Sequence, residues 1–145
     1  SAHKTRFWDL VVDELGGVNC IYTGRRLGVG EYAMEHFIPF QFVAHDQMWN
    51  LIPADPSFNS SKGDRLPLDR HFDGFCTLQR KAVGIVKSIQ SENRFLEDYL
   101  HMFKTHDFDD VVFRQTMVSL RDIAANNGFL LMKDSGVQKT GRTDG

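Results

Sequence analysis

The fold of this 145-residue chain is constrained most by the spacing of its prolines. The four prolines are Pro39, Pro53, Pro56 and Pro67. Proline fixes φ and removes a backbone N–H, so regular structure between these positions must be short. Residues 31–37 and 48–52 form two extended runs that end at Pro39 and Pro53, and Asp55-Pro56 is typical of a helix start. We therefore expect two short strands, then a helix over residues 57–62 that Gly63 ends.

Helical periodicity dominates the rest of the chain. Residues 5–15 predict a helix that ends at Gly16-Gly17, and a further extended run at 19–22 predicts a hairpin with 31–37. After residue 72, apolar side chains recur at intervals of three and four, which predicts three amphipathic helices. Their apolar faces comprise Phe75, Leu78, Ala82, Ile85 and Ile89; Phe95, Leu96, Tyr99, Leu100 and Phe103; and Phe113, Met117, Leu120 and Ala124.

Composition excludes several classes of protein. The two cysteines, Cys20 and Cys76, form no Cys-x-x-Cys pair, which argues against a disulfide scaffold and a structural zinc site. No apolar stretch reaches the ~18–20 residues of a membrane span, so we expect a cytoplasmic protein without a membrane partner. The Ser-Ala-His start and the polar run at 139–145 favour a piece of a larger protein.

The segment 31–67 gathers polar side chains at the ends of its predicted elements. Glu35 and His36 end one strand, Asn50 lies in the next, and Asn59 and Lys62 lie in the helix. A helix laid across two paired strands would bring these ends together. Oxygen donors from Glu35 and Asn59 suit Mg²⁺, and a neutral His36 beside that ion could take a proton from an attacking water.

These residues resemble the motif of the HNH nucleases, which have the ββα-metal fold. The matching stretches are Glu35-His36-Phe37-Ile38-Pro39, Asn50-Leu51-Ile52-Pro53 and Asn59-Ser60-Ser61-Lys62. The resemblance implies an α+β protein with a ββα-metal core over 18–67. An N-terminal helix and a helical extension over 70–130 would complete one domain of residues 1–145.

The same resemblance implies a role for each motif residue. His36 would be the general base, Asn50 would hold the loop between the two strands, and Glu35 and Asn59 would bind the metal ion. Glu35 stands where the family usually has Asp, which leaves the coordination mode and the choice between Mg²⁺, Mn²⁺ and other divalent ions open. Many relatives carry zinc-binding Cys pairs, whereas this segment keeps only Cys20, so packing of the helical extension must brace the core.

The implied activity is metal-dependent hydrolysis of phosphodiester bonds in DNA, double-stranded DNA above all. Lys62, Arg65, Arg25 and Arg26 are the candidate phosphate contacts. Residues 60–90 carry six basic and three acidic side chains, and residues 92–110 carry two basic and six acidic, so a polyanion is expected to meet the first segment. Family analogy favours an effector domain of a larger bacterial protein that defends against invading DNA. The alternatives are a nuclease for RNA or single strands and a non-catalytic nucleic-acid-binding or assembly module.

Other polar and aromatic residues have simpler explanations. We expect the neighbours His45 and Asp46 to bond to each other or to the backbone. Trp49 and Phe58 are expected in the core rather than stacked on bases. A surface position is expected for His71, His101 and His106. The acidic residues Asp107, Asp109 and Asp110 are expected to cap a helix that begins near 109 rather than to bind a second metal ion.

Overall fold

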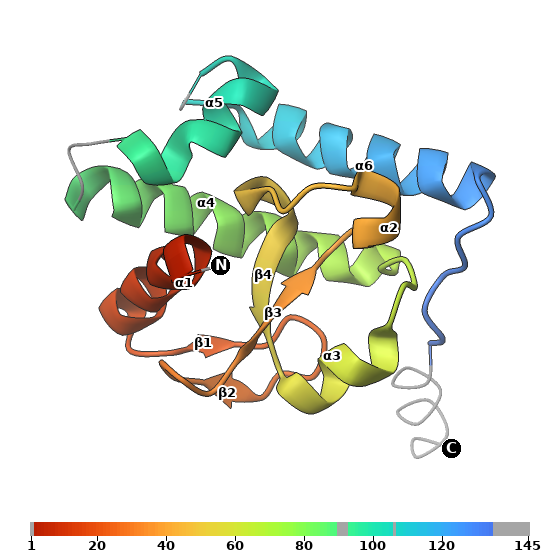
Figure 1. Cartoon of the computed structure of the whole chain (residues 1–145), viewed down its shortest axis with the longest axis horizontal. Helices are drawn as coiled ribbons and strands as arrows, with labels where there is room; N and C mark the ends of the chain where they lie inside the picture. Colours follow the sequence, from red (N-terminus) through yellow and green to blue (C-terminus); the bar gives the residue numbers. More distant parts are fainter. Residues whose placement is uncertain (1, 90–92, 106, 135–145) are drawn as a thin grey trace.

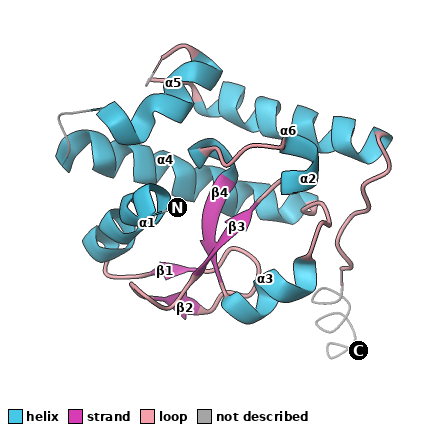
Figure 2. Ribbon diagram, viewed as in Figure 1, coloured by secondary structure: helices cyan, strands magenta, loops and turns pink. Residues whose placement is uncertain are grey.

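The computed structural model describes residues 2–89, 93–105 and 107–134. Helices and short strands alternate along this part of the chain (Figures 1 and 2). The helices are α1 (Ala2–Leu15), α2 (Phe40–Val43), α3 (Pro56–Lys62), α4 (Phe72–Ile89), α5 (Glu97–Phe103) and α6 (Asp110–Asn126). The strands are β1 (Val18–Asn19), β2 (Arg26–Leu27), β3 (Ala33–His36) and β4 (Leu51–Ala54), and the 3-10 turns are η1 (Met48–Asn50), η2 (Asp69–His71) and η3 (Asn93–Leu96).

The strands form two antiparallel pairs, β1 with β2 and β3 with β4. The expected hairpin between 19–22 and 31–37 is wrong, because the chain reverses earlier. The Cys20 amide donates to the Arg25 carbonyl at 2.8 Å, and Gly24, at φ +78°, donates back to the Cys20 carbonyl. This local turn gives β1 its partner before β3 is reached, because a glycine tolerates positive φ.

The second predicted strand is displaced toward the C-terminus. Residues 48–50 form η1 instead of extended chain, and β4 runs through Pro53, which had been expected to close the strand. Pro53 lies opposite Met34 in the register with β3. In a two-stranded sheet each strand has only one neighbour, so the missing N–H of a proline can face away from the ladder.

The predicted start and end of α3 are confirmed. The Asp55 side chain caps the helix by accepting from the Ser57 amide at 3.1 Å, Pro56 is its first residue, and Gly63 follows its end at φ +57°. The hydrogen bond from the Ser57 hydroxyl, together with that from its amide, lowers the pKa of the Asp55 carboxyl. The N-terminal helix is also confirmed, although α1 begins at Ala2 rather than at Thr5.

Three helical segments follow as predicted, but the faces that they bury differ slightly from the predicted ones. The buried face of α4 is rotated from the predicted one, because Val83, Val86 and Gln79 are buried whereas Ile89 is 44% exposed. In the second segment, η3 precedes α5 and Leu100 is exposed. The third face is confirmed at Phe113, Met117 and Ala124, and Asp109 caps α6 as expected.

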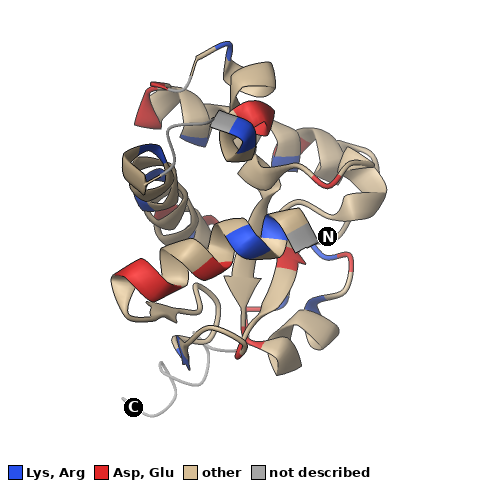
Figure 3. Cartoon of the chain, turned by 60° about the vertical axis from the view of Figure 1, so that its left-hand side comes forward, with Lys and Arg blue, Asp and Glu red and all other residues tan. Residues whose placement is uncertain are grey.

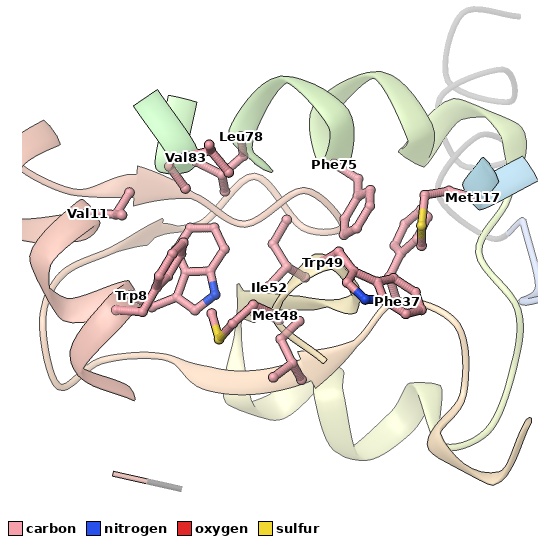
Figure 4. Close-up of a cluster of buried hydrophobic side chains, with 14 of the residues drawn as sticks. Trp8, Val11, Phe37, Met48, Trp49, Ile52, Phe75, Leu78, Val83 and Met117 are labelled. Atoms are coloured by element: carbon pink, nitrogen blue, oxygen red, sulfur yellow. The ribbon is translucent and has the colours of Figure 1, made fainter. Parts of the chain in front are cut away.

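One apolar core joins the strands to the helices. Figure 4 shows side chains from α1, from the β3–β4 unit and from α4 and α6 packed together, among them Trp8, Phe37, Ile52, Phe75 and Met117. In Figure 1 the strand pairs and α3 lie below, with the long helices gathered above and behind. The predicted α+β architecture with helices at both ends is confirmed. None of the helices in the described ranges has the length and hydropathy needed to cross a bilayer.

Candidate active site

A buried asparagine fixes the backbone where β3 ends. The Asn50 side chain is fully buried, accepts from the Ile38 amide at 2.9 Å and donates to the Ile38 carbonyl at 2.8 Å. The Phe37 amide also donates to the Asn50 carbonyl. These three hydrogen bonds pair backbone N–H and C=O groups in the turn after β3, where no regular secondary structure could pair them. They give His36 and its neighbours a fixed position relative to β4.

His36, the last residue of β3, reaches a carboxylate from the next loop. Its Nε2 lies 2.6 Å from Oδ1 of Asp46, and the imidazole is 29% exposed. The expectation that Asp46 would bond to His45 or to the backbone is wrong. Sequence reasoning missed this contact because the sequence shows only that Asp46 lies ten residues after His36, not that the chain doubles back.

Glu35 and Lys62 form a buried ion pair on the neighbouring side of β3. Lys62 Nζ lies 2.9 Å from Glu35 Oε2 and donates to the carbonyls of His36 and Phe37 at 3.1 and 3.4 Å. The Tyr22 hydroxyl donates to Glu35 Oε1. Burial raises the pKa of the Glu35 carboxyl, and the Lys62 ammonium opposes this shift. Burial, with the Glu35 charge beside it, also raises the pKa of Tyr22 well above its usual value.

Asn59 lies in the middle of α3, three residues before Lys62. Residues three apart are neighbours on a helix surface, so Asn59 lies next to Lys62 on α3. Its side chain is partly buried. Within the described residues, its carboxamide makes no hydrogen bond, so the amide oxygen is free to bind another group. The helix therefore brings the Lys62 cation to Glu35 near the end of β3, and the Asn59 carboxamide lies three residues earlier on the same helix.

The comparison with protein families agrees with this arrangement. Residues 20–68 match the family described as HNH endonuclease. This segment belongs to the HNH endonuclease family. The match begins at Cys20, in the turn between β1 and β2, and ends just after α3, so it includes every motif residue discussed above. No curated protein and no solved structure gives a significant match to the chain.

The match to this family suggests nuclease, and therefore hydrolase, activity for the HNH segment. It also implies a nucleic acid as the substrate. HNH nucleases usually use divalent metal ions. Within the described ranges, no group of three or more His, Cys, Asp and Glu side chains could hold a metal ion. An ion at this site would therefore depend on Asn59 together with a carboxylate, and on water and phosphate oxygens for its other positions.

The residues present fit such an ion. The free carboxamide of Asn59 supplies a hard oxygen donor. Each Glu35 oxygen accepts one hydrogen bond and keeps a second lone pair, and metal-binding carboxylates are commonly held by such neighbours. Tyr22 and Lys62 therefore orient the Glu35 carboxylate, and together they offset part of the cost of its burial.

The four predicted phosphate contacts are placed very differently. The Lys62 side chain is completely buried, so the expectation of a phosphate contact is wrong in this arrangement. The Arg26 guanidinium donates hydrogen bonds to the Gly16 carbonyl and to the Asn19 side chain. Arg25 keeps a 60% exposed side chain beside Asp55. Arg65 lines a pocket of about 300 Å³ with Ser61 and Lys133. Arg25 and Arg65 are the two that remain accessible to a phosphate.

Tertiary contacts mix the charges that are segregated along the sequence. Arg80 and Lys87, from the basic segment 60–90, pair with Asp110 and Asp107 of the acidic segment 92–110. Figure 3 shows basic and acidic residues interleaved over the helices in that view. The expected attraction of a polyanion to one segment is therefore weakened, because its cations already face carboxylates.

Several remaining expectations can be compared with the structure. His71 was expected at the surface and is instead buried, with its Nδ1 accepting from the Leu68 amide at 3.1 Å. His101 is exposed as expected, and His106 lies outside the described residues. Trp49 is buried, and Phe58 stacks on Tyr22 at 4.5 Å, so both contribute to packing.

The thiol of Cys20 is free, and its Sγ accepts the Asp55 amide at 3.3 Å. Through this contact the turn after β1 is tied to the residue that caps α3. A single cysteine thus links the two parts of the motif by a hydrogen bond.

Proposed function

We propose that the chain is a metal-dependent endonuclease that hydrolyses phosphodiester bonds of DNA, with His36 as the general base. The observation that supports this role is the hydrogen bonding and exposure of the His36 ring. Its Nε2 is bonded to Asp46, whereas Nδ1 has no hydrogen-bond partner within the described residues and the ring is partly exposed. A neutral imidazole with one free nitrogen at a solvent-facing strand end can accept a proton from water.

The reaction requires a proton to move to His36 as water attacks phosphorus. The bond between the water oxygen and phosphorus forms, and the bond between phosphorus and the leaving sugar oxygen breaks. The proton from the attacking water goes to Nδ1, and the leaving oxygen takes a proton from solvent. Asn50 contributes by fixing the backbone that follows His36, so the base keeps its place during the attack.

We propose Glu35 and Asn59 as the protein ligands of a divalent ion, Mg²⁺ or Mn²⁺. When bound, this ion would stabilise negative charge on the phosphate and the leaving oxygen. Support comes from the free carboxamide of Asn59 and from the oriented carboxylate of Glu35. Lys62 neutralises Glu35 in the absence of an ion, which allows the carboxylate to remain charged while buried.

Contacts to DNA are proposed for two arginines of the HNH segment: Arg25, whose side chain is 60% exposed, and Arg65, which lines a pocket beside α3. Such contacts address the phosphate backbone, so we propose that double-stranded DNA is cut with little sequence preference. From the family likeness alone, we further propose that the chain serves as an effector of a larger bacterial protein that acts on invading DNA.

The proposal is tested by incubating supercoiled plasmid with the purified protein and Mg²⁺, Mn²⁺ or EDTA. We expect nicked or linear products only with a divalent ion, and cleavage slowed by about 10²–10⁴-fold in His36→Ala, the usual contribution of a general base. In parallel, Mg²⁺ should raise the Tm of the wild type and of His36→Ala, because a ligand that binds the folded state stabilises it. Asn59→Ala should lose most of that Tm increase.

A matched substrate panel separates the alternatives. Cleavage of RNA or single-stranded DNA without cleavage of duplex would contradict the proposed substrate. A protein that binds plasmid, shows no Tm increase with Mg²⁺ and cuts nothing would be a non-catalytic binding module.

A further inference from the structure

We propose that Asp46 is a positioning residue for His36, which fixes the orientation and the tautomer of the base. This inference rests on the proposed nuclease function. It also names a residue that lies outside the motif stretches and that acts on the reaction only through His36.

The contact geometry determines which nitrogen can act. Asp46 Oδ1 lies 2.6 Å from His36 Nε2, a short contact of the kind formed when an N–H donates to a carboxylate. An ionised carboxylate is only an acceptor, so the imidazole proton must be on Nε2. The lone pair of the neutral ring is therefore on Nδ1, which makes no hydrogen bond within the described residues. Asp46 thus leaves the reactive nitrogen free while it holds the opposite one.

The loop that carries Asp46 is fixed at both ends. At its start, α2 ends at Ala44, which has φ +63° and donates its amide to the Phe40 carbonyl. A left-handed conformation is unusual for a residue with a side chain, and here it turns the chain back toward β3. At the other end, Asp98 in α5 accepts the Met48 amide at 2.8 Å. Two separate constraints therefore hold Asp46 near His36.

The ring has a second neighbour, which belongs to α2. The Phe40 ring centroid lies 5.3 Å from that of His36 at a tilt of 58°. This contact restricts rotation of the imidazole, whereas only Asp46 distinguishes one ring nitrogen from the other. The two contacts together therefore define both where the ring lies and which way it faces.

The contact with Asp46 also persists after proton transfer. After His36 accepts the proton of the attacking water on Nδ1, the Nε2 proton remains bonded to Asp46, and no proton passes to the carboxylate. The ring therefore keeps its orientation as the proton arrives. Removal of Asp46 should lower the rate of the chemical step more than it lowers substrate binding.

Steady-state cleavage of a defined DNA duplex with Mg²⁺ tests this role. For Asp46→Ala we expect kcat to fall by about 10–100-fold with KM changed less than about twofold, in the range found when a partner that orients a histidine is lost. Asp46→Asn keeps an acceptor of the same size and should retain more activity than Asp46→Ala. His45→Ala, a substitution at the adjacent exposed residue, should keep wild-type activity.

The double variant His36→Ala/Asp46→Ala should be no slower than His36→Ala alone, because Asp46 acts only through the base.

Two results would overturn the inference. One is a rise in KM or a loss of Tm that explains the whole effect of Asp46→Ala. The other is an additive loss in the double variant, which would mean that Asp46 acts independently of His36.

An NMR readout keeps this test separate from that of the nuclease function. The long-range ¹⁵N–¹H spectrum of the wild type, assigned with His36→Gln, should show His36 with its proton on Nε2, and Asp46→Ala should show a mixture of tautomers. This result is expected even if no DNA is cut. A mixture already present in the wild type would overturn the role of Asp46, whatever the cleavage assay shows.

Discussion

Lys62 illustrates how burial changes what a charged residue can do. An ammonium group has three donors, and Lys62 has three acceptors within reach: the Glu35 carboxylate and the carbonyls of His36 and Phe37. An exposed lysine at the end of α3 could bind a phosphate, whereas this one ties the end of α3 to the end of β3. Because a buried charge without a partner is costly, the pair must be kept or removed as a unit.

Burial of His71 leads to a prediction about how stability depends on pH. Burial, and the Arg70 charge beside it, lower the pKa of its imidazole to about 4. Since the folded-state pKa is below the unfolded value, the folded state binds fewer protons between pH 6.5 and 4. The contribution of His71 to stability is thus complete above pH 6.5 and lost as the pH falls toward 4. We expect a loss of at most about 3 kcal/mol in the free energy of unfolding.

Urea unfolding at a series of pH values measures this loss. His71→Asn is the matched control, because its amide oxygen can accept the Leu68 amide but cannot be protonated in this range. The wild type should lose more stability than His71→Asn between pH 7 and 4. Parallel curves for the two proteins would contradict the assignment.

At the scale of elements, the helical extension holds η1 through polar contacts as well as through packing. Gln79 of α4 donates to the carbonyls of Met48 and Leu51, at 3.1 and 2.7 Å, and accepts from the Tyr99 hydroxyl at 2.5 Å. Because Asn50 lies in η1 and fixes the turn after β3, these bonds link the extension to the site. The sequence predicted a packing brace in place of zinc, but a glutamine on an apolar face gave no sign of this role.

Gln79→Leu should therefore be strongly destabilising. It preserves the approximate size of the side chain but leaves two buried carbonyls and a hydroxyl without this partner. We expect a loss of about 2–4 kcal/mol in the free energy of unfolding, measured in urea. Arg80→Ala, on the exposed side of the same helix, should cost less than about 1 kcal/mol, because its pair with Asp110 is exposed to solvent. Equal losses in the two variants would show that Gln79 contributes nothing specific.

For the whole molecule, we propose that the HNH core over 18–67 and the extension over 70–130 fold as one unit. Buried residues of both parts pack into a single core, and the segment after α6 returns to the HNH core, where the Met132 amide donates to the Leu66 carbonyl at 2.9 Å. Small domains with one continuous core usually unfold without intermediates.

The two tryptophans can test this proposal because Trp8 lies in α1 and Trp49 in η1. Trp49→Phe and Trp8→Phe each leave one fluorescent reporter, in the N-terminal helix and in the HNH core respectively. In each single-Trp variant, fluorescence and far-UV circular dichroism should give the same urea midpoint. A Trp49 transition that precedes or follows loss of helix would show that the two parts unfold separately.

The sequence by itself determined most of the helices and the family of the segment 20–68. Proline spacing, the Asp55-Pro56 cap and the periods of three and four residues are local signals, so they predicted α3, α1 and the later helices correctly. The motif predicted the HNH family, which the comparison confirmed. Tertiary structure alone decided which charges are buried and which side chains meet. Asp46 contacts His36 and Lys62 contacts Glu35 because the chain reverses at Ala44 and α3 crosses the end of β3. Such contacts depend on packing between distant segments, which no local pattern encodes.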